Sequence, residues 1–223
     1  SYDIIVGRVS PGDNLYGSAI ELTDLEKQQN ILNQVNKIID YEQIIDNILN
    51  SSNDLDTTWI RNVLGIASNE GRDSGIDGLS DNEFMRLELE KYRNNLNCTY
   101  VELYQSNFNS GHLEQPTETF EGIKYDETGD PVYTDLVSEI NEGISLLLYA
   151  GHADELTLTT TNFDVSHVDS LTNSQKYFLG CVVGCSLGSH DEDNMSLSEK
   201  LQIAENKGSI AMFSSSILQN WEE

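Results

Sequence analysis

The sequence is poor in basic residues and has no long apolar run. Lysine and arginine together number 12, against 38 aspartates and glutamates, and the formal net charge is −26. A nucleic-acid-binding surface needs a basic face, so this balance argues against nucleic acid as a partner. No apolar stretch is long enough to cross a bilayer, so we expect no transmembrane segment. The acidic excess fits cationic substrates, bound calcium or an extracellular setting, and it also fits plain solvated surface.

Cysteine is scarce as well. Cys98, Cys181 and Cys185 are too few, and odd in number, for a disulfide framework. Cys181 and Cys185 lie close together in one strand-like run, which is a poor geometry for pairing with each other. The sequence contains no CxxC or HExxH spacing, which argues against a zinc site. An unpaired thiol is therefore a candidate nucleophile.

Strand and helix patterns alternate along the chain. Its 223 residues, 38% of them hydrophobic, are enough to bury a full core. Strand-length apolar patterns cover residues 62–68, 98–104, 144–152, 177–185 and 209–213. Capping boxes predict three helix starts, at Thr23 with Glu26, Ser80 with Glu83, and Ser196 with Glu199. The alternation predicts an α/β fold with a mainly parallel sheet and helices on both faces.

The helical patterns also suggest which sides are buried. In the first helix the apolar residues recur at helical spacing, which predicts that they pack on the sheet: Ile31, Leu32, Val35, Ile38 and Ile39. Phe84, Leu87, Tyr92 and Leu96 mark the second helix. The last helix is expected to close at Lys207 and Gly208.

One polar segment is a plausible boundary. We predict a partial N-terminal subdomain of one strand and one helix over residues 1–50, a linker over 51–58, and a main catalytic subdomain over 59–223. Residues 1–7 already have a strand pattern, so we expect the first subdomain to be cut from something longer. An upstream chain or segment would then complete the domain.

Two apolar runs carry the chemistry. Residues 144–152 and 177–185 are typical of strands buried on both faces. Each run breaks at a glycine, and the first ends at His152 and the second at Cys185. Ligands of parallel sheets bind beyond the carboxyl ends of the strands, so an imidazole and a thiol would share one edge. An imidazolium activates a cysteine by lowering its pKa. The alternative is a buried structural thiol and a hydrogen-bonded loop histidine. The other histidines, His112, His167 and His190, are expected on the surface.

These runs resemble the approach to the catalytic residues in the gingipains and related processing peptidases. Residues 140–146 followed by Tyr-Ala-Gly-His at 149–152 are similar to the gingipain approach to the histidine. Residues 171–173 and 176–179, leading to Cys185, are similar to the approach to the nucleophile, and the interval between the two is ungapped. The resemblance covers most of the chain. It implies a caspase-like fold and a secreted or surface cysteine endopeptidase.

The resemblance also implies individual roles. Cys185 is the nucleophile, His152 the general base, and Glu70, in the segment 67–71, a carboxylate that assists the histidine. The backbone N–H groups of Cys185 and Ala153 hold the oxyanion. Asp81 would lie at the base of the pocket for the residue before the cut bond. From the residues alone, Glu70 is equally a solvated strand-end acid, and Asp81 a residue that favours a helix N-terminus.

The resemblance also bears on substrate specificity and calcium binding, and two alternative functions stay open. The resemblance implies cleavage after arginine or lysine, with Trp221 as an aromatic wall of the pocket. The chemistry needs no cofactor; structural calcium is expected from the acidic loops, without assigned ligands. The sequence departs from the family at Ala153-Asp154, where Gly-Ser is usual, and at Gly184, where another cysteine is usual. The alternatives are a processing peptidase or transpeptidase of surface proteins, and a catalytically inert gingipain-like binding module.

Overall fold

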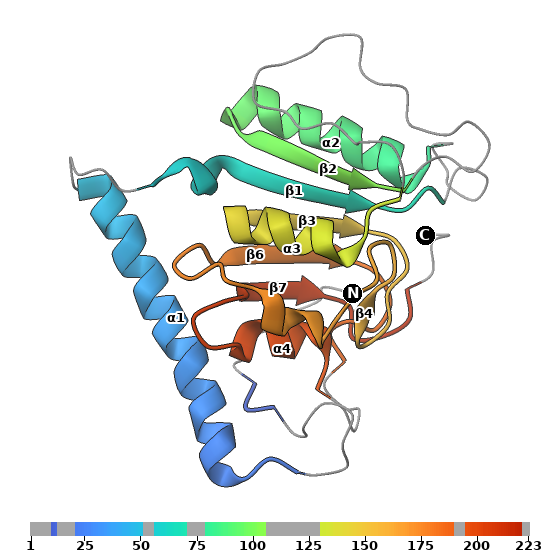
Figure 1. Cartoon of the computed structure of the whole chain (residues 1–223). Helices are drawn as coiled ribbons and strands as arrows, with labels where there is room; N and C mark the ends of the chain where they lie inside the picture. Colours follow the sequence, from blue (N-terminus) through green and yellow to red (C-terminus); the bar gives the residue numbers. More distant parts are fainter. Residues whose placement is uncertain are drawn as a thin grey trace, which may run out of the picture.

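A parallel sheet forms the centre of the molecule (Figure 1). The computed structural model describes residues 10–12, 21–50, 56–70, 79–105, 130–189 and 195–219. Within these ranges the sheet has five strands in the order β2-β1-β3-β6-β7, and every pairing is parallel. The strands are β1 (Asn62–Ala67), β2 (Thr99–Tyr104), β3 (Leu146–Ala150), β6 (Phe178–Val183) and β7 (Ser209–Ser214). The predicted sheet is confirmed.

The strand order creates a switch point next to β1. The chain passes from β1 outward to β2, then crosses back to β3 on the other side of β1 and continues to β6 and β7. Ala67 at the end of β1 pairs with Ala150 at the end of β3, which pairs with Val183 at the end of β6. Three strands therefore end level with one another at the edge where ligands of such sheets bind.

Helices cover both faces of the sheet, as predicted. On one face α2 (Asp81–Leu96) packs Met85 and Leu89 in a cluster with Val63 and Ala67 of β1. The alternate residues of β1, Leu64 and Ile66, belong to a second cluster. This cluster also holds buried residues of α3 (Tyr133–Glu142) and α4 (Leu197–Ile203). Because successive strand residues point to opposite faces, α2 lies on one face and α3 and α4 on the other.

The first helix, α1 (Asp24–Asn50), buries a different face from the one predicted. Its capping box is confirmed, but its buried residues are Gln34 and Lys37. The Lys37 ammonium donates to the carbonyl oxygens of Leu201 at 3.1 Å, Lys207 at 3.1 Å and Ser209 at 2.9 Å. Burial lowers the pKa of Lys37 to about 7. Carbonyl groups of α4 and of the chain entering β7 thus pack against a polar face of α1.

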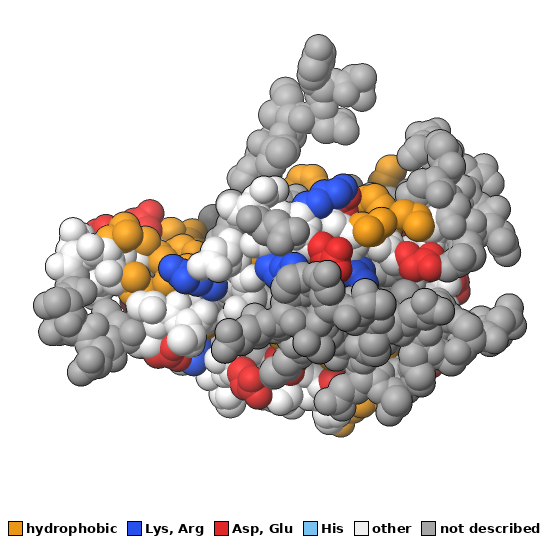
Figure 2. All heavy atoms as spheres, turned by 90° about the horizontal axis from the view of Figure 1, so that it is seen from above, with side chains coloured by type: hydrophobic (Ala, Val, Ile, Leu, Met, Phe, Trp, Pro, Cys, Tyr) orange, Lys and Arg blue, Asp and Glu red, His pale blue; other side chains and the backbone are white. Residues whose placement is uncertain are grey.

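The apolar residues of α1 are consequently exposed. The prediction that they pack on the sheet is wrong for all five: Ile31, Leu32, Val35, Ile38 and Ile39. The predicted helix α2 is confirmed, but Phe84 and Leu87, two of the residues that marked it, are exposed, and Met85 and Leu89 face the sheet. Figure 2 shows hydrophobic side chains at the surface toward the α1 end of the molecule and over α2. Helical period predicted these helices but not their orientation.

Three further details differ from the sequence pattern. The strand β6 is not buried on both faces, since Leu179 and Val183 are exposed. Helix α4 ends at Ile203, before the predicted stop. An antiparallel pair of two-residue strands, β4 (Thr157–Leu158) and β5 (Phe163–Asp164), was not predicted because so short a hairpin has too little alternation to detect.

No helix in the described ranges has both the length and the apolar character needed to span a membrane. The division into subdomains at 1–50, 51–58 and 59–223 stays a prediction, and residues 1–9 lie outside the described residues.

Candidate active site

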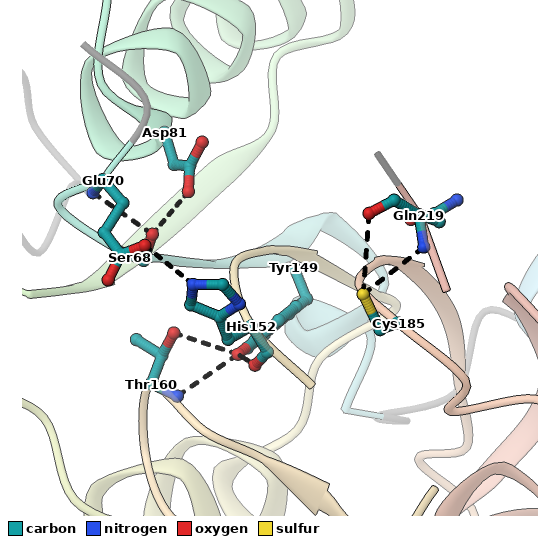
Figure 3. A network of polar contacts seen from close by, with 8 residues as sticks. All are labelled: Ser68, Glu70, Asp81, Tyr149, His152, Thr160, Cys185 and Gln219. Atoms are coloured by element: carbon teal, nitrogen blue, oxygen red, sulfur yellow. Dashed lines mark hydrogen bonds and ion pairs between the residues drawn. The ribbon is translucent and has the colours of Figure 1, made fainter. Parts of the chain in front are cut away.

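The imidazole of His152 is paired with a carboxylate from the neighbouring strand end. His152 follows β3 and Glu70 follows β1, and the Nε2 and Oε2 atoms lie 2.7 Å apart (Figure 3). The side chains are 55% and 59% exposed, so the pair adds little to stability and acts mainly on orientation. Because a carboxylate only accepts hydrogen bonds, Nε2 carries the proton in the neutral ring. Nδ1 is then the basic nitrogen.

The thiol of Cys185 lies beyond β6 and is bracketed by a later segment. Its Sγ accepts a hydrogen bond from the Gln219 N–H at 3.4 Å and donates to the Gln219 carbonyl at 3.7 Å. The Ser186 N–H donates to the Ile217 carbonyl at 3.1 Å, so residues 217–219 run beside the nucleophile. Within the described part of the chain, the thiol hydrogen-bonds to this segment and not to the imidazole. In Figure 3 the His152 ring lies between the Glu70 and Cys185 sides of the site.

The other two cysteines lie in less favourable surroundings for a nucleophile. Burial raises the pKa of the Cys98 thiol and of the Cys181 thiol. A raised pKa lowers the thiolate fraction at neutral pH. All three cysteines are unpaired, as expected. Cys98 and Cys181 therefore serve as internal references for the reactivity of Cys185.

Two backbone N–H groups beyond the strand ends, those of Ala153 and Cys185, have no acceptor among the described residues. Ala153 pairs with Leu158 in an isolated antiparallel bridge. Its flanking hydrogen bonds run from Thr159 N–H to the His152 carbonyl and from Asp154 N–H to the Thr157 carbonyl, each 3.1 Å. In such a pair the central N–H points away from the partner strand. Among the described residues, neither Ala153 nor Cys185 donates its N–H to a protein group. This arrangement suits an oxyanion.

Asp81 lies next to the pair of His152 and Glu70. It is the first residue of α2, the Ser68 hydroxyl donates to its carboxylate, and its N–H donates to the Glu70 carbonyl at 2.9 Å. Burial raises the pKa of the Asp81 carboxyl, and the nearby Glu70 charge adds to that rise. A half-buried carboxylate with one hydroxyl donor is a good receptor for a cationic group. The helix N-terminus also stabilises it.

Several sequence expectations fall on residues that the structure does not describe. Trp221 lies outside the described residues, as do His112 and His190 and the acidic loops 71–78, 106–129 and 190–194. Within the described ranges, no group of three or more His, Cys, Asp or Glu side chains could hold a metal ion. Structural calcium therefore stays a prediction without ligands.

One histidine differs from its prediction as a surface residue. The His167 ring stacks on Tyr133, with centroids 3.8 Å apart, and its side chain is only partly exposed. Its Nδ1 accepts a hydrogen bond from the Asp164 N–H at 3.0 Å. The aromatic contact, formed between α3 and a distant turn, holds it inward. His167 follows the hairpin of β4 and β5, and its contacts are with Tyr133, Phe163 and Asp164.

Sequence reasoning missed the groups that support the site. Ser68 bonds Asp81, Gln219 bonds Cys185, and Tyr149 and Thr160 hydrogen-bond below His152 (Figure 3). Tyr149 is the one side chain with a polar group in the apolar strand β3, which is a signal that could have pointed to it. The others lie in loops, where no periodicity singles them out.

Comparison with known proteins places these features in one family. The model of peptidase family C25 matches residues 24–220. Gingipain R2 and gingipain R1 of Porphyromonas gingivalis are each 26% identical over 225 residues, covering 98% of this chain. The chain spans only 26% and 19% of the length of these two curated relatives.

Solved structures show the same fold. The crystal structure of the Arg-specific cysteine proteinase gingipain R superposes with a TM-score of 0.67 at 23% identity, covering 87% of this chain and 39% of that one. The complex of the Porphyromonas gingivalis RgpB pro- and mature domains gives the same TM-score and identity, with 87% of this chain and 40% of that one. The expected caspase-like architecture agrees with this likeness.

Proposed function

Because the chain belongs to peptidase family C25, we propose that it is a cysteine endopeptidase that cleaves after arginine or lysine. One observation carries the proposal. His152, with its ring on Glu70, and Cys185 follow the paired strands β3 and β6 at the same edge of the sheet. The sequence resemblance assigned the base and the nucleophile to these same two residues.

The proposed reaction is acyl transfer through the thiol. His152 takes the Cys185 proton, and the thiolate forms a bond to the peptide carbonyl carbon, whose π electrons move to oxygen. The N–H groups of Cys185 and Ala153 stabilise that oxyanion. As the tetrahedral intermediate collapses, the C–N bond breaks and imidazolium protonates the leaving amine. His152 then deprotonates a water molecule that attacks the thioester, and the thiolate leaves. Glu70 orients the ring and stabilises its charged form.

Asp81 supports the proposed preference for basic residues. Its carboxylate would form a charge-assisted hydrogen bond with a cationic side chain, bidentate with arginine. Because burial disfavours the charged carboxylate, a bound cation would relieve an existing cost. The names of the relatives agree with this choice, since one solved neighbour is described as Arg-specific. Trp221 remains a proposed wall of this pocket.

Location and partners belong to the same proposal. We expect peptide or protein substrates with basic residues, and an extracellular or cell-surface setting, which the acidic composition suits. An upstream segment or chain remains a proposed partner; the solved RgpB complex contains pro- and mature domains. Structural calcium is a further proposal that the mechanism does not use.

A peptide panel that varies only the residue before the cut tests the proposal. Cleavage after arginine or lysine is expected, and Cys185→Ala or His152→Ala should reduce it by about 10³-fold or more. Cys181→Ala is the matched control and should keep activity, since that thiol lies on the sheet away from the strand ends. Asp81→Asn should remove the preference for basic residues. Cleavage after acidic or large apolar residues would refute the role of Asp81.

Two alternatives need other readouts. A transpeptidase uses the same residues but passes the acyl group to an amine, so mass analysis of products formed with an added amine separates it from a hydrolase. An inert binding module would show no preferential thiol reactivity. Equal alkylation rates at Cys98, Cys181 and Cys185 would favour the module, because burial already slows the first two.

A further inference from the structure

A buried hydrogen-bond network lies directly behind the catalytic histidine. Tyr149 of β3 and Thr160 are both buried. The Tyr149 hydroxyl lies within hydrogen-bond distance of the His152 carbonyl and 3.0 Å from the Thr160 hydroxyl, and it accepts from the Thr160 N–H at 3.2 Å. A carbonyl cannot donate, so Tyr149 donates its only proton to His152. The Thr160 hydroxyl must then donate to the phenol oxygen.

The carbonyl that Tyr149 holds belongs to the peptide bond between His152 and Ala153. That carbonyl also accepts from the Thr159 N–H at 3.1 Å, so two donors fix it. A trans peptide is planar, and its N–H points opposite to its C=O. Fixing the His152 oxygen therefore holds the Ala153 N–H pointing away from the Tyr149 hydroxyl and the Thr159 N–H. A well-bonded carbonyl also polarises its peptide and strengthens the N–H as a donor.

The surroundings leave this network little freedom. A Cβ added at Gly151 would come within 2.8 Å of Thr160 Oγ1 and 3.2 Å of the Tyr149 hydroxyl, so the turn before His152 packs tightly on the network. Both lone pairs and the proton of the phenol are used. Burial raises the pKa of the Tyr149 phenol, so the hydroxyl keeps its proton at neutral pH.

We propose that Tyr149, supported by Thr160, is a positioning residue that orients the Ala153 N–H as an oxyanion donor through the His152–Ala153 peptide. The inference rests on the proposed peptidase function and adds a residue to it. A purely structural tyrosine would stabilise the fold without distinguishing reactions that form an oxyanion from reactions that do not.

The test compares three reactions of Tyr149→Phe and the unaltered chain. Hydrolysis of an arginine peptide amide passes through an oxyanion, and kcat should fall about 10- to 100-fold, less than the loss of a whole donor, with KM nearly unchanged. Binding of the corresponding peptide aldehyde, whose thiol adduct carries an oxyanion, should weaken in proportion. Alkylation of Cys185 by iodoacetamide displaces iodide at a saturated carbon without an oxyanion, and its rate should stay within about twofold.

Matched variants separate this effect from loss of fold. Tyr177→Phe removes the hydroxyl of another buried tyrosine, before the start of β6, and should change none of the three readouts. Thr160→Val should reproduce part of the Tyr149→Phe loss, and Thr160→Ser, which keeps the hydroxyl, should restore it. Should Tyr149→Phe fail to fold, the valine and serine variants carry the same comparison.

The outcomes are distinct. Unchanged hydrolysis in Tyr149→Phe overturns the inference alone, as does an alkylation rate that falls as far as hydrolysis. If the unaltered chain neither hydrolyses the peptide nor binds the aldehyde, the proposed function fails and this inference fails with it.

Discussion

The ends of β3 and β6 carry the proposed base and nucleophile, yet they are held in different ways. At the end of β3, His152 is positioned by side chains: Glu70 hydrogen-bonds to its ring, and Tyr149 hydrogen-bonds to its carbonyl. At the end of β6, the Gln219 backbone brackets the Cys185 thiol. The base is therefore sensitive to single side-chain changes, whereas the holding of the thiol depends on the path of a whole segment.

The two strand ends also differ in charge. Glu70 and Asp81 both lie on the His152 side, whereas the Cys185 thiol hydrogen-bonds to neutral backbone groups of Gln219. Negative charge on this side of the site suits a cationic substrate. The difference predicts that acid-to-amide changes act on the base and on specificity and leave the reactivity of the thiol segment alone.

Among changes that test this difference in charge between the two strand ends, removing the charge of Glu70 should have the largest effect. Glu70→Gln keeps the shape of the side chain and can still accept a hydrogen bond from Nε2, but it no longer stabilises the imidazolium. We therefore expect kcat to fall about 10- to 100-fold. The loss is smaller than for a buried triad acid because this pair is exposed. Steady-state kinetics with an arginine peptide measures it. Glu88→Gln, which alters a partly exposed acid on α2 that pairs with Lys91, is the control. A kcat equal to that of the unaltered chain would exclude Glu70 from the mechanism.

The next largest effect concerns Gly184, where the chain beyond β6 packs against the chain beyond β3. A Cβ added at Gly184 would lie 2.9 Å from the Ala153 Cβ and 3.0 Å from the Gly151 carbonyl oxygen. Gly184→Ala should therefore destabilise the fold by about 1–3 kcal/mol through overpacking. Adding Ala153→Gly should recover part of the loss, since it removes one of the two contacts.

Urea unfolding of both single variants and the double variant measures this coupling. If the two changes simply add, the strand ends do not press on each other at this point. Coupling would explain why this chain pairs alanine at 153 with glycine at 184. The departures from the family pattern at these two positions would then be a single adjustment.

The smallest effect concerns pH and separates Asp81 from the base. Because burial raises the pKa of Asp81, its carboxyl gains a proton at a higher pH than an ordinary aspartate. The neutral form cannot pair with a cation, so kcat/KM for an arginine peptide should fall by about twofold, relative to a citrulline peptide, at the pH that equals this pKa. Any pH effect that the two peptides share cancels in this ratio. A ratio that is flat with pH would contradict the assignment.

The same raised pKa has an opposite consequence for stability. The folded state binds the Asp81 proton more tightly than the unfolded chain, so this residue's contribution to stability falls as pH rises from the ordinary aspartate range through the raised pKa. Ionised Asp81 is thus a cost to the fold that the proposed substrate site retains.

Much of the fold could be predicted because its signals are local. The capping boxes at Thr23, Ser80 and Ser196 lie at helix starts, and the strands of the sheet follow the apolar runs. His152 and Cys185 could be placed at strand ends for the same reason. The short hairpin of β4 and β5 could not be found, since its strands are too brief to show a period.

The buried faces of helices were harder to predict. The periodicity of α1 is real, yet Lys37 on another face is buried, because three carbonyl groups from positions 201–209 meet it only in the folded chain. In α2, Leu89 rather than Leu87 meets the sheet. A hydrophobic period indicates an amphipathic helix, but the packing partner determines its rotation.

The sequence by itself determined the secondary structure and the chemical groups at the strand ends, because period, capping and glycine breaks depend on neighbours in the chain. The tertiary structure decided the strand order, the partner of each polar group and the aim of the Ala153 N–H. Those depend on contacts such as Glu70 with His152 and Gln219 with Cys185, which join positions far apart in sequence. Only folding brings their atoms within hydrogen-bonding distance.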